Sequence, residues 1–234
     1  MSRLRPVLAL LSVIVVLTAC TPNKSKTSGN AAGGALPAGD TLLTESAAAM
    51  RDIKTAQFLI TADGTIAGLS LRRAEGTLTK EGSAKGTAQV DQSGLAVELT
   101  FVIVGDKIYL KGPTGGYQTL PLSLAASVYD PSAILSPDRG IAKVLSTATG
   151  AKTEASESVD GKDAWRVAVT VKSADLQTII PGVTGDVPGK VWIASTDKRL
   201  LKATFTLPPA GDAKGGTVTV TFKEFDAPAT ISAP

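Results

Sequence analysis

Alternating apolar and polar residues between positions 55 and 119 constrain the fold more than any other feature of the chain. The clearest run places apolar residues at every second position: Val97, Leu99, Phe101 and Ile103. This period directs one set of side chains to each face of a strand, so that one face is buried and the other is polar. About five such runs are joined by short turns, at Asp63-Gly64, Glu81-Gly82, Val104–Lys107 and Gly115-Gly116. Short turns indicate antiparallel neighbours.

The last third of the chain repeats this pattern. Strands are predicted over residues 164–171, 191–193, 201–207 and 218–222. Asp160-Gly161 and Asp197-Lys198 are the expected hairpin turns, because Asp and Gly tolerate the backbone angles that tight turns require. The whole chain is therefore expected to contain roughly nine antiparallel strands.

Helices are predicted at the start and in the middle of the chain. A stripe of apolar residues at helical spacing predicts a helix over Asp40–Ile53, capped by Asp40 or Thr41. One or two helical turns are expected over 122–128. Asp130-Pro131 and Ser136-Pro137 each place a capping residue before a proline, which favours a helix start. The second of these helices is expected to end near Gly150, and Ser173 to cap a short helix over 174–180.

Strands followed by helices and then by strands predict an α+β fold, a curved antiparallel sheet wrapped over several helices. The folded domain is expected to span residues 40–232. Residues 21–39 are rich in Gly, Ala, Ser, Thr and Pro and predict a flexible tether.

The N-terminal segment has the features of an export signal. Arg3 and Arg5 precede an apolar run over 7–17, which is shorter than the roughly 20 residues that a membrane span needs. Leu17-Thr18-Ala19-Cys20 resembles the lipobox of bacterial lipoproteins, in which the cysteine is acylated and the chain is cut before it. We therefore predict a signal peptide over 1–19 and a lipidated Cys20. The alternative is an ordinary cleaved signal with a chance cysteine.

The residue types that are missing exclude several functions. The sequence contains no histidine, and Cys20 is its only cysteine. Catalytic pairs that use histidine, and metal sites built from histidine or thiolate ligands, are therefore not expected, and neither is a cofactor. Without Arg3 and Arg5 the net charge falls from +3 to +1, which gives no support for nucleic-acid binding.

Three polar features allow a functional reading and an ordinary one. Ser195–Lys198 fits the S-x-x-K pattern of enzymes with a serine nucleophile, but it falls at an expected hairpin and not at a helix start. Asp130, Asp138, Asp160 and Asp163 suggest paired carboxylates, but Asp130 is better explained as a helix cap and Asp160 as part of a hairpin turn. Lys24 and Lys26 suit either anionic headgroups or a soluble tether.

Three segments carry a resemblance to a known family: Gly64–Leu71, Tyr129–Leu145 and Val191–Ile193. They resemble the LppX/LprA/LprF/LprG family of mycobacterial-type envelope lipoproteins. The resemblance implies a half-barrel of antiparallel sheet curved over helices with an apolar cavity between them, similar to the LolA/LolB carriers of Gram-negative periplasms. It also implies an exported protein without catalytic activity, anchored by lipid to the outer face of the cell membrane.

The ligands and partners expected from this resemblance are acylated envelope lipids. They comprise phosphatidylinositol mannosides, lipomannan, lipoarabinomannan and triacylglycerol, which such proteins help to move toward the cell surface alongside a membrane transporter. The competing hypothesis is a structural or adaptor lipoprotein with a fully packed core, whose partner is another envelope protein.

The apolar residues of the strands and helices are the candidate cavity lining. Periodicity alone favours an ordinary packed core, although many of the interior candidates are small and small side chains fill space poorly. The resemblance favours a cavity. Its expected lining is Ile60, Leu69, Leu71, Leu78, Ala88, Val90, Val97, Leu99, Phe101, Ile103, Ile134, Ile141, Val144, Leu145, Val167, Val169, Ile179 and Ile193.

Overall fold

The computed structural model describes residues 35–125, 133–177, 179–180 and 183–234. Residues 36–234 form one compact unit, and the other unit, 1–35, lies outside the described residues except for Ala35. The predicted signal peptide, Cys20, Lys24 and Lys26 therefore lie outside the described part of the chain.

The first six strands form a meander in which each strand pairs with the next. Their bounds are β1 (Thr55–Thr65), β2 (Leu71–Thr79), β3 (Ala84–Gln92), β4 (Leu95–Val104), β5 (Lys107–Lys111) and β6 (Gln118–Pro121). The last five strands form a second meander, β7 (Thr149–Val159), β8 (Lys162–Val171), β9 (Val187–Ala194), β10 (Leu200–Leu207) and β11 (Gly215–Phe225).

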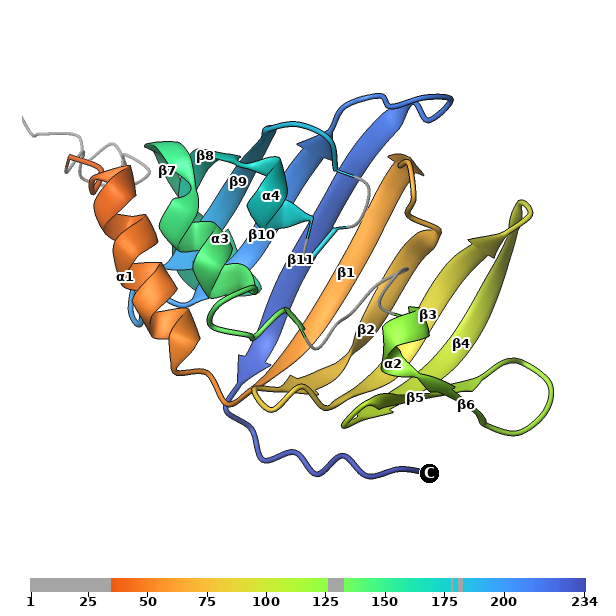
Figure 1. Ribbon diagram of the computed structural model, residues 1–234. Coiled ribbons are helices and arrows are strands. Elements are labelled where there is room, and N and C mark those ends of the chain that lie inside the picture. Colours follow the sequence, from red (N-terminus) through yellow and green to blue (C-terminus); the bar gives the residue numbers. More distant parts are fainter. Residues whose placement is uncertain (1–34, 126–132, 178, 181–182) are drawn as a thin grey trace, which may run out of the picture. The chain divides into compact units, whose positions relative to one another are not determined.

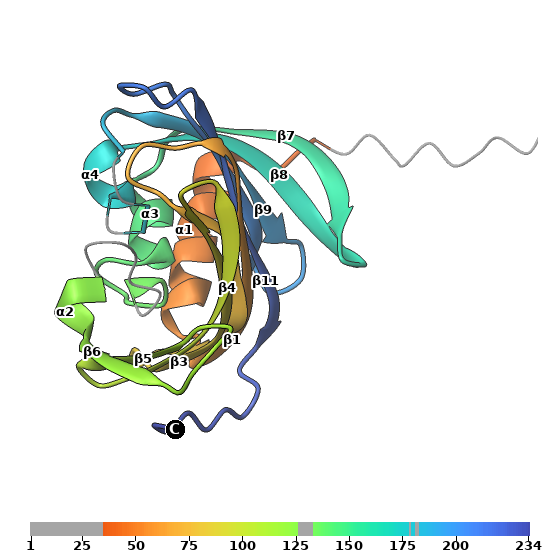
Figure 2. The ribbon, with the colours of Figure 1, turned by 90° about the vertical axis from the view of Figure 1, so that its right-hand side faces the viewer.

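The two meanders join along β1 and β11 into one antiparallel sheet with the order β6-β5-β4-β3-β2-β1-β11-β10-β9-β8-β7. Helices α1 (Gly39–Arg51), α3 (Ile141–Thr147) and α4 (Ser173–Leu176) lie over the half that contains β7–β11 (Figure 1). Helix α2 (Leu122–Ala125) lies beside β5 and β6. The sheet curves around the helices (Figure 2), which confirms the predicted fold.

Two glycines bring the backbones of β2 and β3 close together. Gly76 of β2 lies directly opposite Gly86 of β3. A Cβ on Gly76 would lie 2.1 Å from the main-chain oxygen of Lys85, and one on Gly86 would lie 2.0 Å from that of Glu75. Only glycine permits such an approach, and a glycine inside a strand typically marks a tight bend.

The core lies between the helices and the concave face of the sheet. The apolar stripe of α1 is buried as predicted, with Leu42, Leu43, Ala47 and Met50 at 3% exposure or less. These side chains belong to the same cluster as the buried residues of α3 and of β8–β11. Burying a side chain of this size stabilises the fold by about 1.5–3 kcal/mol, so packing on the sheet explains why α1 forms.

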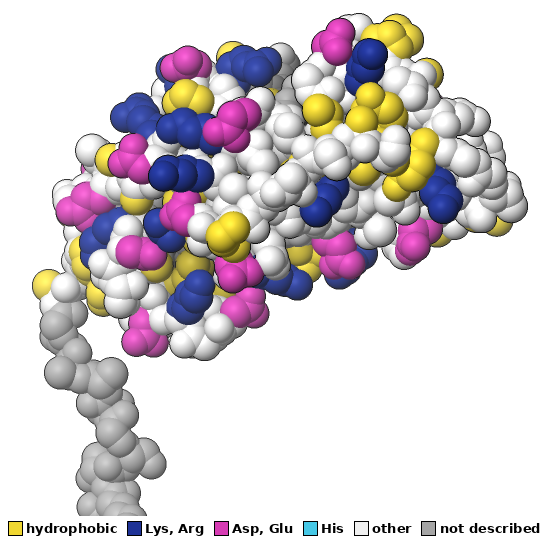
Figure 3. All heavy atoms as spheres, turned by 90° about the horizontal axis from the view of Figure 1, so that it is seen from below, with side chains coloured by type: hydrophobic (Ala, Val, Ile, Leu, Met, Phe, Trp, Pro, Cys, Tyr) yellow, Lys and Arg dark blue, Asp and Glu magenta, His cyan; other side chains and the backbone are white. Residues whose placement is uncertain are grey.

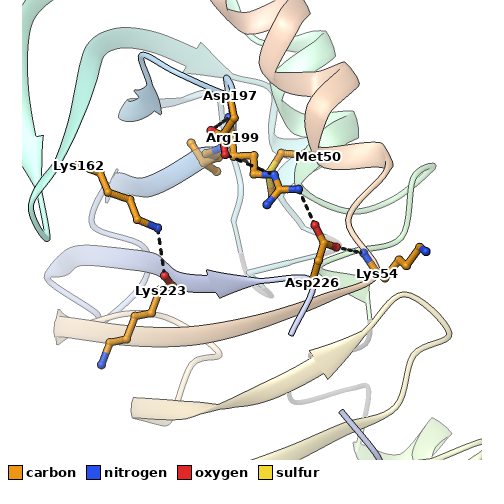
Figure 4. A network of polar contacts seen from close by, with 8 residues as sticks. Met50, Lys54, Lys162, Asp197, Arg199, Lys223 and Asp226 are labelled. Atoms are coloured by element: carbon orange, nitrogen blue, oxygen red, sulfur yellow. Dashed lines mark hydrogen bonds and ion pairs between the residues drawn. The ribbon is translucent and has the colours of Figure 1, made fainter. Parts of the chain in front are cut away.

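A polar network ties the two meanders together at the ends of β11 and β1 (Figure 4). The side chain of Asp226 accepts hydrogen bonds from the main-chain N–H of Lys54 at 2.9 Å and from the Arg199 guanidinium at 2.5 Å. The Arg199 Nε also lies 3.6 Å from the Asp197 Oδ2. Close by, the main-chain N–H of Leu200 points at the Met50 sulfur, 3.4 Å away.

The helix predictions were partly wrong at their ends. Helix α1 begins at Gly39 with Ala38 as its N-cap, and no side chain caps it. Helix α3 begins at Ile141, because the Gly140 N–H bonds to the Ser136 carbonyl and closes a turn there instead. Helix α4 covers only Ser173–Leu176. Asp130-Pro131 and residues 126–128 lie outside the described residues.

The described residues contain eleven strands where roughly nine are predicted, and β7 is the clearest difference. The predicted helix extends to about Gly150, whereas β7 starts at Thr149. Its apolar alternation is weak because the strand lies at the sheet edge and its residues are mostly polar. The Asp160-Gly161 hairpin turn is confirmed, with both residues at positive φ.

Candidate functional site

An apolar cavity of about 280 Å³ opens over the first meander. This volume lies just below the roughly 300–1,000 Å³ typical of small-molecule sites. Strands β1–β6, the residue before β2 and helix α2 supply its lining: Phe58, Ser70, Leu71, Ala74, Ala88, Val90, Leu99, Phe101, Ile103, Ile108, Leu110, Leu120 and Leu124. Ser70 is the one polar residue among them, so the cavity suits an uncharged apolar ligand.

Cross-strand pairing explains why space remains over β2 and β3. Residues directly opposite each other on neighbouring strands share a face of the sheet. One row across the strands therefore contains Phe58, Gly76, Gly86, Phe101 and Leu110. The next row contains Ile60, Ala74, Ala88 and Leu99. In both rows, large side chains on β1 and β4 stand on either side of small residues on β2 and β3. In the second row this leaves a hollow, which Ala74 and Ala88 line.

A second, more polar pocket adjoins the cavity, and the two share Ser70 and Leu71. An ion pair between Arg72 and Asp91 lines it, with the Arg72 Nε 3.1 Å from the Asp91 carboxylate. The hydrogen bond from Arg72, followed by one from the Gly94 N–H, lowers the pKa of Asp91 from its usual value. Polar groups therefore stand at one end of an apolar cavity.

Six of the eighteen predicted lining residues line this cavity: Leu71, Ala88, Val90, Leu99, Phe101 and Ile103. They come from β2, β3 and β4. Leu69 lies in the adjoining polar pocket. Val97 lies opposite Val90 and is partly buried outside the lining.

The other ten predicted residues are buried in the packed core and do not line the cavity: Ile60, Leu78, Ile134, Ile141, Val144, Leu145, Val167, Val169, Ile179 and Ile193. Most of them belong to the helices or to β8 and β9. The structure thus brings together six candidates from β2, β3 and β4. Ile60 and Leu78 of the first meander lie in the same packed cluster as the candidates of the helices, β8 and β9.

Seven lining residues were not among the candidates: Phe58, Ser70, Ala74, Ile108, Leu110, Leu120 and Leu124. Three of them carried a usable signal, because Phe58 alternates with Ile60, and Ile108 and Leu110 alternate within one strand. No pattern marked Leu120 or Leu124, which project from a short edge strand and a four-residue helix.

The Ser195–Lys198 segment is the hairpin between β9 and β10, as predicted. The Lys198 ammonium donates to the main-chain oxygen of Ser195 at 2.8 Å. Lys198 has φ of 60°, and no helix starts at Ser195. This geometry is that of a turn and not that of a nucleophile with its base.

The strongest charge network lies on β7–β9, away from the cavity lining. Arg166 pairs with both Glu154 and Glu157, and Lys190 lies 3.0 Å from Glu154. The Trp192 indole donates to Glu157 at 2.7 Å and is the main cause of its lowered pKa. The pKa of Glu154 is lowered by Lys190 and then by Arg166. Among the described residues, no group of three or more Asp, Glu, His or Cys side chains is placed to hold a metal ion.

A comparison with known protein families identifies the family of this chain. The model of the LppX_LprAFG lipoprotein family matches residues 38–231. The chain belongs to this lipoprotein family. The resemblance seen in the sequence is therefore confirmed. No helix among the described residues is long and apolar enough to cross a membrane.

Curated relatives extend over nearly all of the chain. The lipoarabinomannan carrier protein LprG of Mycolicibacterium smegmatis is 32% identical over 97% of this chain and 94% of its own length. The LprG protein of Mycobacterium tuberculosis H37Rv is 32% identical over 84% of this chain and 83% of its own.

Two solved structures share the fold. LprF from Mycobacterium bovis superposes with a TM-score of 0.72 at 22% identity, covering 84% of this chain and 96% of its own. LppX from Mycobacterium tuberculosis gives a TM-score of 0.63 at 20% identity, covering 82% and 98%. At these identities the likeness is one of fold, and it agrees with the curved sheet described above.

Proposed function

We propose that this protein is a membrane-anchored lipid carrier that holds acyl chains in the cavity over β2–β4. The observation that carries the proposal is the cavity itself, whose lining contains one polar residue, Ser70. Each buried methylene contributes about 0.8 kcal/mol, so a chain of several carbons binds without polar recognition. An unpaired charge would find no partner in this lining, and burying one is costly.

The proposed ligands are acylated envelope glycolipids and lipoglycans, namely phosphatidylinositol mannosides, lipomannan and lipoarabinomannan, or triacylglycerol. Relatives at 32% identity bear the name of lipoarabinomannan carriers, which supports this class. In this proposal the protein helps to transfer the lipid to the outer cell envelope, alongside a membrane lipid transporter, and acts without catalysis.

The proposed anchor is the acylated Cys20, which follows Leu17-Thr18-Ala19. It would hold the protein at the outer face of the cell membrane, and two or more acyl chains give the stable attachment that one chain does not. Cys20→Ala is expected to release the protein from the membrane fraction. If the Cys20→Ala protein stays in the membrane fraction as fully as the parent, Cys20 is not the anchor. The cavity proposal does not depend on this result and is tested separately.

The test of the carrier is a substitution that fills the cavity. Ala88 lies on its floor and is partly buried. In Ala88→Trp the indole would occupy the space of an acyl chain, so the melting temperature of the lipid-free protein is expected to hold or rise. Lipid recovered by organic extraction and measured by mass spectrometry is expected to fall.

The opposite result favours the adaptor hypothesis. In a close-packed region the added indole costs about 1–3 kcal/mol, and the melting temperature falls. If this happens and the parent protein also yields no lipid, the carrier is ruled out. An adaptor lipoprotein that binds another envelope protein then remains.

A further inference from the structure

The edge of the sheet beside the cavity carries exposed apolar side chains. Tyr117, Leu120 and Leu124, here called the apolar lip, are 40%, 37% and 64% exposed. Tyr117 directly precedes β6, Leu120 belongs to β6 and Leu124 to α2. Figure 3 shows hydrophobic side chains gathered at the upper right of the face seen from below, the side on which α2, β5 and β6 lie, with charged side chains around them.

The apolar lip is continuous with the inside of the cavity. Leu120 and Leu124 are exposed to solvent and also line the cavity. Leu120 lies opposite Ile108, which is buried at 7% exposure and lines the cavity as well. An apolar surface therefore leads without a polar break from solvent to the interior.

Basic residues accompany the apolar lip. Lys107 and Lys111 of β5 are exposed, and the Lys111 ammonium lies 5.9 Å from the centre of the Tyr117 ring. Lys107 lies opposite Pro121, the last residue of β6. The sequence from 107 to 125 contains these two lysines and no acidic residue, and Asp106 directly precedes it. Leucines beside a tyrosine and lysines are typical of segments that bind at a membrane interface.

We propose that the apolar lip docks on the surface of a bilayer that contains anionic lipids, and that acyl chains pass there between the bilayer and the cavity. The two leucines enter the boundary between headgroups and acyl chains, while Tyr117 lies at headgroup level. The two lysines face lipid phosphates, toward which long basic side chains extend. The inference rests on the proposed lipid-carrier function and adds the place and the partner of loading.

Leu95, the first residue of β4, is a matched control for Leu124. Leu95 is 71% exposed, more than Leu124, and follows the Ser93-Gly94 turn. It does not line the cavity. Exposure alone therefore predicts equal membrane contact for the two leucines, whereas docking through the apolar lip predicts contact only for Leu124.

The first experiment places a fluorescent reporter at each leucine. Full-length Leu124→Trp and Leu95→Trp proteins are mixed with vesicles of equal phosphatidylglycerol and phosphatidylcholine that carry bromine on their acyl chains. Quenching beyond that of the parent, which has Trp165 and Trp192, is expected for Leu124→Trp and not for Leu95→Trp. Equal quenching of the two, or none at position 124, overturns the proposal.

The second experiment measures lipid transfer to the same vesicles without bromine. Leu120→Asp with Leu124→Asp is expected to slow transfer at least tenfold, while Leu95→Asp leaves it unchanged. Lys107→Gln and Lys111→Gln are each expected to lower vesicle affinity about fivefold, and only when phosphatidylglycerol is present.

Extraction and transfer measured together distinguish a failure of docking from a failure of the carrier function. A protein that yields lipid on extraction, loses it in Ala88→Trp and transfers normally with both lip leucines replaced overturns docking and leaves the carrier standing. A protein that yields no lipid at all overturns both.

Discussion

The two halves of the sheet have similar strands and different neighbours. The inner side chains of β8–β11 lie under α1, α3 and α4 and are almost completely buried, as in Val167, Val191 and Ala203 at 1% or less. Several inner side chains of β2–β4 line the cavity, and three of them, Ala88, Val90 and Leu99, remain partly exposed. Alternation along a strand therefore specifies which face is apolar and leaves open what covers it.

Glycines show the same contrast. In the second meander the Phe205 ring covers Gly189, where an added Cβ would lie 2.7 Å from it. In the first meander the neighbouring backbone occupies the space beside Gly76 and Gly86. In the adjacent row, Ala74 of β2 lies opposite Ala88 of β3, and both line the cavity. A small residue becomes part of a cavity only where no large side chain from another element fills the space above it.

The largest expected effect is at the glycine pair. Gly86→Ala places a Cβ about 2.0 Å from the Glu75 carbonyl oxygen, so β2 and β3 must separate. We expect a loss of about 3 kcal/mol or more in the free energy of unfolding, measured by urea titration. Gly116→Ala is the control, because nothing lies within 4 Å of its added Cβ, and it is expected to stay within about 0.5 kcal/mol of the parent.

The next effect compares the two halves directly. Ala203 is 0% exposed beneath the helices, so Ala203→Trp overpacks the core and costs about 1–3 kcal/mol or somewhat more. For a domain of this size each kcal/mol lowers the melting temperature by about 2–4 °C. Ala88→Trp is expected to leave the melting temperature of the lipid-free protein unchanged or higher. Equal losses in both variants would mean that the halves are packed alike.

A smaller effect concerns the contact between the two meanders. Asp226→Ala removes the acceptor for the Lys54 N–H and the Arg199 guanidinium, and we expect a loss of about 1–2 kcal/mol. Part of this loss is backbone strain, because Asp226 has φ of 59°. Asp226→Gly removes the same contacts without that strain and should be less destabilising. A larger loss in the glycine variant would contradict this division.

The smallest effect is the pH dependence of stability. The folded-state pKa values of Asp91, Glu154 and Glu157 lie below their usual 3.8 to 4.5. Carboxyls with a lowered pKa stabilise the folded state above the usual value, and the stabilisation is lost as the pH falls through the lowered pKa. The urea midpoint should therefore be constant at neutral pH and fall below about pH 4.5. In Glu157→Gln, which cannot ionise, the fall should be shallower, and an unchanged slope would contradict the assigned cause.

Most of the fold could be predicted from the sequence, because its main signals are local. Period-two runs such as Val97–Ile103 and the Asp160-Gly161 turn define strands and hairpins. Strand β7 was missed because an edge strand with a mostly polar sequence lacks this signal. The start of α3 was misplaced because the Gly140 turn depends on contacts with Ala133 and Ile134.

The candidate site was less predictable than the fold. The face of Ala88, Leu99 and Phe101 follows from alternation, so these residues could be assigned to a cavity or a core. The choice between the two depends on where the helices lie, which no strand sequence contains. The sequence therefore does not separate Val167 and Ile193 from Leu99, although the structure places them in different halves.

The most direct test of the account is to map where an acyl chain binds. A glycolipid with a photoactivatable diazirine on its acyl chain is loaded onto the protein, irradiated and located by peptide mass spectrometry. Crosslinks are expected on β2–β4, at residues such as Leu71, Val90 and Leu99. Crosslinks on β8–β10, or an absence of crosslinks from a protein that stays folded, would contradict the assignment of the cavity as the lipid site.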